Sequence, residues 1–194
     1  MVVMRRFLAA AVLALPAALW AQTSSGTCAS PFAVTLDAGR HISMHLRAGD
    51  VEIVGTAKPG LRVTCRVDDD EAGNVKISFA ASNLRTYGGP DHSLHFRIEV
   101  PAKTNLLVRL TAGDLQVSGI SGDKDIQLRA GDLTIGIEHP EEYRVAEGSV
   151  LAGDLNASAF GVEKDGLFRN FRKENAHGQY RLHAELLAGD LTLR

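Results

Sequence analysis

The sequence has few of the features that mark a catalytic or metal-binding protein. It contains two cysteines, Cys28 and Cys65, at a spacing that excludes a Cys-x-x-Cys zinc or redox motif. Gly-x-Ser-x-Gly, His-Glu-x-x-His, Walker and dinucleotide-binding motifs are also missing. The formal net charge is only -2, and no basic patch favours nucleic acid as a partner. We therefore expect a non-enzymatic protein with no catalytic residues, no cofactor and no bound metal.

The N-terminus predicts export. Arg5 and Arg6 precede an apolar run over residues 7–19, and Ala21 stands before a polar stretch. This layout is typical of a secretory signal peptide, with cleavage expected after Ala21. The alternative is a retained anchor, but the run is shorter than the roughly 20 residues that span a bilayer. We expect a periplasmic, extracellular or cell-envelope protein, with no transmembrane segment once residues 1–21 are removed.

The two cysteines of an exported chain are predicted to form one disulfide, because export delivers the protein to an oxidising compartment. Closing the loop between Cys28 and Cys65 would stabilise the fold by about 4 kcal/mol on the chain-entropy model. The alternative is two unpaired thiols, with Cys65 buried between Val63 and Val67.

A four-residue pattern, Ala-Gly-Asp followed by Val or Leu, recurs five times along the chain. Glycine adopts positive φ without steric cost and aspartate bonds to nearby backbone, so each copy predicts a structural turn. Successive glycines are 64, 18, 22 and 36 residues apart. The shorter spacings fit one coil of a solenoid, and the longer ones are close to two and three coils. The turn residues are Gly49, Asp50, Gly113, Asp114, Gly131, Asp132, Gly153, Asp154, Gly189 and Asp190.

The segments that flank the turns alternate apolar and polar residues, as strands do. Leu106, Val108 and Leu110 precede the second turn, for example, and Leu115 and Val117 follow it. A short strand pair cannot bury its apolar face alone, so neighbouring repeats must stack. We predict an all-β fold, a solenoid-like parallel β-helix built on the Ala-Gly-Asp turns, with longer N-terminal strands packed onto it.

The domain organisation follows from these signals. Residues 1–21 are the signal peptide, residues 22–32 an N-terminal linker and residues 33–194 a single β-repeat domain. The open ends of a stack need covers. We expect the N-terminal half to supply one cover and a loop over residues 160–177 to supply the other. That loop carries the exposed basic cluster Arg169, Arg172 and Lys173.

The repeated turns resemble the bacterial putative-adhesin domain family, a β-strand-repeat family of largely unknown function found in envelope and secreted proteins. The resemblance also rests on Val-Pro-Ala-Lys-Thr at residues 100–104 and on the closing segment at residues 180–191. It covers most of the chain from about Ala33 onward. The family name implies adhesion, and the resemblance brings no catalytic residues with it.

The repeated aspartates are the strongest candidate in the sequence for a cation-binding site. Equivalent residues in stacked strands lie about 4.8 Å apart, close enough for carboxylates to repel. Calcium would relieve that repulsion, and so would backbone hydrogen bonds and solvent. The Gly-Gly-x-Gly-x-Asp repeats of calcium-binding β-rolls are absent, which favours structural turns over calcium.

A second candidate surface comes from the residue two positions after each repeated aspartate, which should point outward. This ladder is polar but mostly neutral, as expected of a solvated or weakly sugar-binding surface. Its members are Glu52, Gln116, Thr134, Asn156 and Thr192.

The leading functional hypothesis is an exported or cell-envelope binding module, adhesion-like, whose ligand the sequence does not identify. Envelope polysaccharide and surface protein are the candidate partners. Two alternatives stay open: a carbohydrate-active β-helix enzyme, and a calcium-stabilised structural envelope protein.

Overall fold

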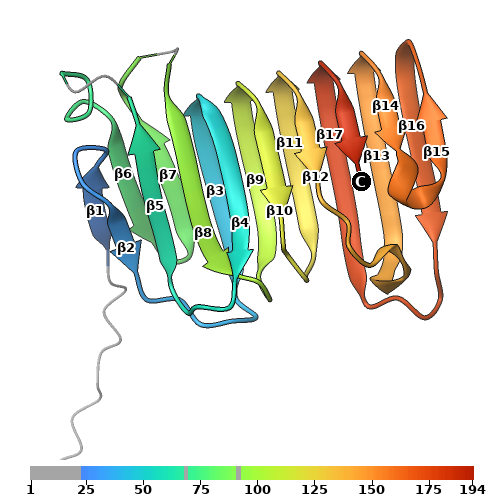
Figure 1. Ribbon diagram of the computed structural model, residues 1–194, viewed down its shortest axis with the longest axis horizontal. Helices are drawn as coiled ribbons and strands as arrows, with labels where there is room; N and C mark the ends of the chain where they lie inside the picture. The colour runs from blue at the N-terminus through green and yellow to red at the C-terminus, as the bar shows by residue number, and fades with distance from the viewer. Residues whose placement is uncertain (1–22, 68–69, 91–92) are drawn as a thin grey trace, which may run out of the picture.

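The computed structural model describes residues 23–67, 70–90 and 93–194, which form two sheets packed face to face (Figure 1). The predicted signal peptide, residues 1–21, lies outside the described residues. Each sheet has nine strands. Two short 3-10 helices, η1 (Pro140–Glu142) and η2 (Ser158–Phe160), interrupt the strands. In the described part of the chain, no helix combines the length and apolar character needed to cross a membrane.

Sheet A has the strand order β1 (Ser24–Thr27), β6 (Lys76–Ala80), β7 (Asn83–Tyr87), β3 (His41–Ala48), β9 (Asn105–Ala112), β11 (Lys124–Ala130), β17 (Tyr180–Ala188), β13 (Tyr143–Ala152) and β16 (Leu167–Glu174). Sheet B has the order β15 (Val162–Lys164), β14 (Leu155–Ala157), β18 (Leu191–Leu193), β12 (Leu133–Ile135), β10 (Leu115–Ser118), β4 (Asp50–Thr56), β8 (His95–Pro101), β5 (Leu61–Arg66) and β2 (Phe32–Val34). Each Ala-Gly-Asp copy joins a strand of sheet A to the next strand in sheet B.

The all-β prediction is confirmed, whereas the parallel β-helix is not, because both sheets are mixed. Central strands pair in parallel, as β9 does with β3 and β11. Toward the ends the chain reverses in antiparallel pairs, β1 with β6 and β13 with β16. The N-terminal strands extend the same two sheets instead of packing onto a separate stack.

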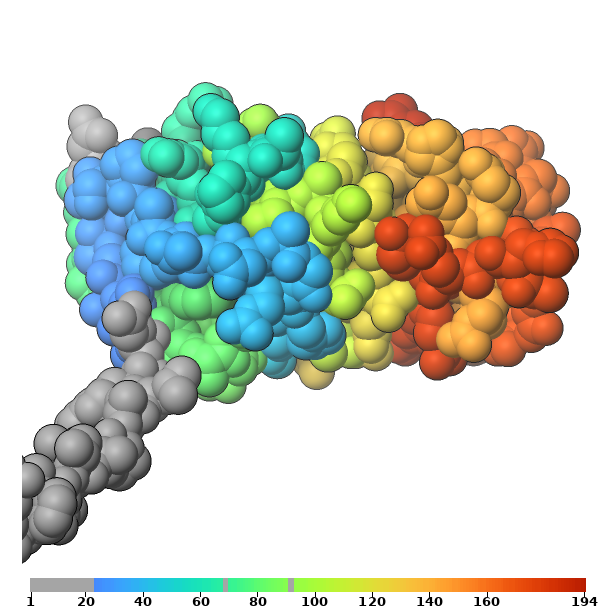
Figure 2. Space-filling view, turned by 90° about the horizontal axis from the view of Figure 1, so that it is seen from below, coloured from blue at the N-terminus to red at the C-terminus, as the bar shows by residue number. Residues whose placement is uncertain are grey.

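The longer spacings of the repeat are excursions of the chain and not extra coils. Between Gly49 and Gly113 the chain builds β5 to β8 and returns, so that β9 lies directly beside β3. Between Gly153 and Gly189 it builds β15 and β16, and β17 then inserts between β11 and β13. In the view from below, the red C-terminal segment accordingly lies next to the yellow one (Figure 2).

Apolar side chains fill the space between the sheets. Parallel register places equivalent residues side by side, so Met44 of β3 neighbours Val108 of β9, which neighbours Ile126 of β11. All three are fully buried. Such rows explain the alternation in the sequence, since every second residue of a strand faces the core. The opposite residues form two outer faces exposed to solvent.

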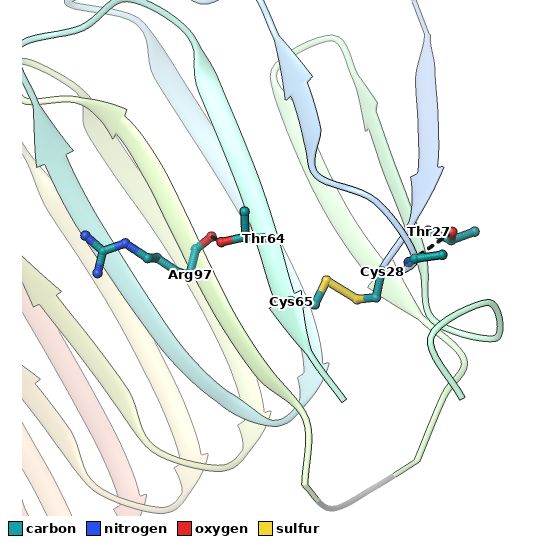
Figure 3. Close-up of a disulfide and its surroundings, with 6 residues drawn as sticks. Thr27, Cys28, Thr64, Cys65 and Arg97 are labelled. Atoms are coloured by element: carbon teal, nitrogen blue, oxygen red, sulfur yellow. Dashed lines mark hydrogen bonds between the residues drawn. A yellow bond between two sulfur atoms is a disulfide. The ribbon is translucent and has the colours of Figure 1, made fainter. Parts of the chain in front are cut away.

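Residues 22–32, expected to be a linker, contribute to the fold from Ser24 onward. Ser24–Thr27 is β1, which pairs with β6, and Phe32 begins β2 with its ring buried. A disulfide joins Cys28, just after β1 of sheet A, to Cys65 in β5 of sheet B (Figure 3). The covalent link between the two sheets holds this N-terminal segment against the sandwich.

The far end of the sandwich is closed by strands where the sequence suggested a loop. Residues 160–177 include β15 and β16, which add one antiparallel strand to each sheet. Phe171 is buried there, whereas Leu167 and Phe168 are exposed. The basic cluster Arg169, Arg172 and Lys173 therefore belongs to β16 and not to a loop.

Candidate binding groove

The five Ala-Gly-Asp corners lie along one long edge of the molecule, at the top of Figure 1. Their glycines have φ between 113° and 133°. The corners also approach each other closely: a Cβ on Gly131 would lie 2.2 Å from the carbonyl oxygen of Gly113. Positive φ and this close approach both require glycine at these positions.

The aspartates of the corners form a hydrogen-bonded ladder. The backbone N–H of Asp132 donates to Oδ1 of Asp114 at 3.0 Å, and that of Asp190 donates to Oδ1 of Asp132 at 2.9 Å. The N–H of Asp154 donates to Oδ1 of Asp190 at 3.0 Å, and the N–H of Asp114 donates to Oδ1 of Asp50 at 3.3 Å. Backbone donors thus offset the repulsion between neighbouring carboxylates and hold one oxygen of each.

An open groove of about 820 Å³ crosses the outer face of sheet B. Its floor consists of β5, β8, β4, β10 and β12, which lie side by side in that order. Outward side chains of these strands line it in two rows that run across the sheet. The upper row, at the level of the corners, contains Arg66, His95, Asp50, Asp114 and Asp132, and the lower row contains Thr64, Arg97, Glu52, Gln116 and Thr134.

The lower row contains the polar ladder that the sequence suggested. Register places Glu52 beside Gln116 and Gln116 beside Thr134, and all three line the groove. Thr192 and Asn156 continue the same row beyond the groove, on β18 and β14. The structure therefore brings all five predicted outward residues into one line.

Contacts between basic and acidic side chains occupy the centre of the groove. Arg97 Nη1 contacts Glu52 Oε2, and Arg97 Nε lies 3.4 Å from Glu99 Oε1. The hydrogen bond with Glu52 is the main reason that the pKa of Arg97 lies above its ordinary value. His95 Nδ1 lies 3.2 Å from Asp50 Oδ2. The Arg97 side chain extends over the sheet and away from the disulfide (Figure 3).

Sequence reasoning missed the contribution of β5 and β8 to this surface. Arg66, His95 and Arg97 stand outside the Ala-Gly-Asp pattern, in the long excursion between the first two copies. Alternation of Leu94, Phe96 and Ile98 shows that His95 and Arg97 face outward. It does not show that β8 pairs with β4, which is what places them beside the repeat.

The groove offers no cluster suited to a metal ion. Among residues 23–67, 70–90 and 93–194, three or more His, Cys, Asp or Glu side chains do not converge anywhere in a metal-binding arrangement. The ladder instead spreads its carboxylates along an edge, with one oxygen of each bound to backbone. What the groove provides is a set of hydroxyl, carboxamide and charged groups at regular spacing, suited to hydrogen bonding.

Away from the groove, Lys124 is buried in the core at the start of β11. Its Nζ donates to the carbonyl oxygens of Ile120 at 2.8 Å and Gly122 at 3.3 Å, and to the hydroxyl of Tyr143. Burial lowers the pKa of Lys124 to about 8. Burial also raises the pKa of Tyr143 above its ordinary value. Lys124 therefore binds carbonyl groups that would otherwise be buried without a donor.

Comparison with known proteins supports the fold. No protein-family model matches the chain, and no curated protein matches it. A solved structure from Clostridium sporogenes, described as a "putative cell adhesion protein", has a TM-score of 0.52 at 12% identity. The match covers 84% of this chain and 98% of that chain.

A second structure, described as a "putative adhesin" from Bacteroides fragilis, covers 89% of this chain and 97% of its own at 8% identity. Its TM-score of 0.27 is too low to indicate a shared fold. The first match shows a shared fold alone. The description of the first structure is consistent with the resemblance to the putative-adhesin domain family.

Proposed function

We propose that this protein is an exported, non-enzymatic binding module and that its binding surface is the groove on sheet B. The observation that carries the proposal is the continuous polar row from Thr64 to Thr134, which crosses five neighbouring strands. The spacing of about 4.8 Å between strands places hydrogen-bonding groups at regular intervals. Such a surface suits an extended, hydrated polymer more than a small molecule.

The chemistry of the row favours an envelope polysaccharide as that polymer. Thr64, Gln116 and Thr134 offer hydroxyl and carboxamide groups that pair with sugar hydroxyls. The apolar residues that line the groove, including Val51, Phe96 and Leu115, are buried beneath its floor. A partner held by apolar contacts would find little surface to bind.

The charges in the groove favour binding over catalysis. Glycoside hydrolysis uses two carboxyl groups that flank the scissile bond. Here Glu52 pairs with Arg97, Asp50 lies against His95, and each ladder aspartate accepts a backbone hydrogen bond. These contacts give the carboxylates a structural role, and we assign no residue to catalysis.

Export is supported by two independent features. The disulfide between Cys28 and Cys65 is of the kind that persists in oxidising compartments. The predicted signal peptide supplies the route, with the mature chain beginning at Gln22. Mass spectrometry of the protein recovered from cell fractions tests both points. A cytosolic protein that retains Met1 would contradict them.

Binding to a panel of immobilised cell-envelope polysaccharides tests the function itself. We expect at least one to bind, and the double variant Gln116→Ala with Thr134→Ala to bind at least ten-fold more weakly. Gln127→Ala is the matched control, because Gln127 lies on the outer face of sheet A. The proposal fails if no polysaccharide binds, or if the control loses as much affinity as the double variant.

A further inference from the structure

Resting on the proposed function, we propose that the groove selects a zwitterionic polysaccharide. The ligand carries an anionic group over β5 and protonated amines over β10 and β12. The inference comes from the described groups of the groove that no other described side chain contacts as a charged partner. These unpaired charges have opposite signs at the two ends.

The cationic end is Arg66. It is exposed at the end of β5 and lines the groove beside His95, its register partner on β8. Within the described part of the chain, the Arg66 guanidinium makes no ion pair. Arg97 and His95, the other basic groups of the groove, are already engaged by Glu52, Glu99 and Asp50. Among the described residues of the groove, Arg66 is therefore the cation available to an incoming anion.

The anionic end is formed by Asp114 and Asp132. Each is exposed, and each uses Oδ1 to accept a backbone N–H from the next corner. Neither carboxylate makes an ion pair with any residue that the structure describes. Their second oxygens therefore remain available to a cation on the ligand. The ladder explains why these side chains keep one orientation: the hydrogen bond to Oδ1 fixes each carboxylate at the rim of the groove.

The separation of the two ends sets the size of the ligand. Arg66 and Asp132 stand on strands four positions apart in sheet B, which corresponds to about 19 Å. A single sugar cannot bridge that length, so the site suits an oligosaccharide of several rings. The hydroxyl and carboxamide groups of Thr64, Gln116 and Thr134 lie between and beside the two ends.

A peptide fits this surface less well. All five strands under the groove are paired on both sides, so no free strand edge offers backbone hydrogen bonds to an added strand. A purely anionic polymer would meet the carboxylates of Asp114 and Asp132, and a purely cationic one would meet Arg66. A polysaccharide that carries both charges can contact Arg66 at one end of the groove and the two aspartates at the other.

Four matched hexasaccharides test the proposal. The zwitterionic probe alternates glucuronic acid with glucosamine. The anionic probe has its amines acetylated, the cationic probe has its carboxylates reduced, and the neutral probe has both changes. We expect calorimetry with the full mature protein to rank the zwitterionic probe first, several-fold tighter than each of the others. Exposed charge contacts of this kind change affinity about two- to five-fold each.

Three variants test which residue of the groove recognises each charged group of the ligand. Arg66→Gln removes the preference for the carboxylate and leaves the preference for the amine. Asp132→Asn does the converse, and its amide oxygen still accepts the Asp190 N–H, so the corner keeps its hydrogen bond. Arg129→Gln, on the other sheet, is the control and changes neither preference.

Two results separate this inference from the proposed function. If all four hexasaccharides bind equally and Gln116→Ala weakens them all, the zwitterionic preference is wrong and the groove still binds glycans. If neither these probes nor any envelope polysaccharide binds, the proposed function is wrong as well. Equal effects of Arg66→Gln and Arg129→Gln would also overturn the assignment of the cationic end.

Discussion

The backbone N–H of Asp190 donates a 2.9 Å hydrogen bond to Oδ1 of Asp132, although the two residues are 58 positions apart in the chain. The bond links the last copy of the repeat to the third, because β17 pairs with β11. An aspartate that looks like a local turn residue therefore acts between neighbouring corners.

The Asp132 carboxylate is expected to stabilise the fold through this contact. Asp132→Ala removes the acceptor, and we expect it to lower the free energy of unfolding by about 1–2 kcal/mol, since hydrogen bonds to charged groups contribute about 1.5–3 kcal/mol and this one is exposed. Asp132→Asn keeps an acceptor oxygen and should cost much less. Urea denaturation compares the three proteins. Equal losses in the two variants would show that the charge matters and the acceptor does not.

Glycine at the corner is expected to contribute more to the stability of the fold than the aspartate does. Gly131→Ala introduces a Cβ 2.2 Å from the Gly113 carbonyl oxygen at a φ of 122°. We expect a loss of about 3 kcal/mol or more, because backbone strain and a backbone clash act together. Gly161→Ala is the control: its φ is 69°, but no atom lies within 4 Å of the added Cβ. Thermal denaturation should show about 1 kcal/mol for that control, and similar losses in both variants would contradict the close packing of corners.

The lowered pKa of Lys124 predicts that the protein becomes more stable at mildly alkaline pH. Burial lowers its pKa from 10.5 to about 8, so between these values the unfolded chain binds more protons than the folded one. Stability therefore increases with pH, by at most about 1 kcal/mol per pH unit. Lys124→Met should remove this rise, although it also lowers stability at every pH by leaving the Ile120 and Gly122 carbonyl groups without a donor.

Denaturation of both proteins from pH 7.5 to 9.5 gives the two slopes. Above pH 10 the effect of Tyr143 has the opposite sign: its pKa is raised, so the stability it contributes is complete below pH 10 and is lost as pH rises further. Parallel slopes for the wild-type protein and Lys124→Met would show that Lys124 does not titrate differently in the folded state.

The disulfide is expected to stabilise the fold by restricting the unfolded chain. Its cysteines are 37 positions apart, for which the chain-entropy model gives about 4 kcal/mol. The double variant Cys28→Ser with Cys65→Ser should lose stability of this order. Hydrogen exchange should then show lower protection throughout the sandwich, with the largest change in β1 and β2, which the disulfide holds to β5. A variant as stable as the wild type would mean that strand pairing alone secures the N-terminal segment.

The local features of this protein follow from its amino-acid sequence alone. Alternation of apolar and polar residues marked the strands of the repeat and their inward faces, because a strand's side chains point to opposite sides in turn. Ala-Gly-Asp marked the corners, because glycine at positive φ leaves a local signature. Outward-facing Gln116 and Thr134 were therefore predictable as members of a polar ladder.

Which strands lie next to each other depends, in contrast, on the folding of the whole chain. Nothing local shows that β17 inserts between β11 and β13, or that the excursion after Gly49 brings His95 beside Asp50, since these pairings join segments far apart in the chain. Strands of similar pattern are interchangeable in sequence, and the order that buries every apolar face is a property of the whole sandwich. The groove exists only because that order places β5 and β8 next to the repeat.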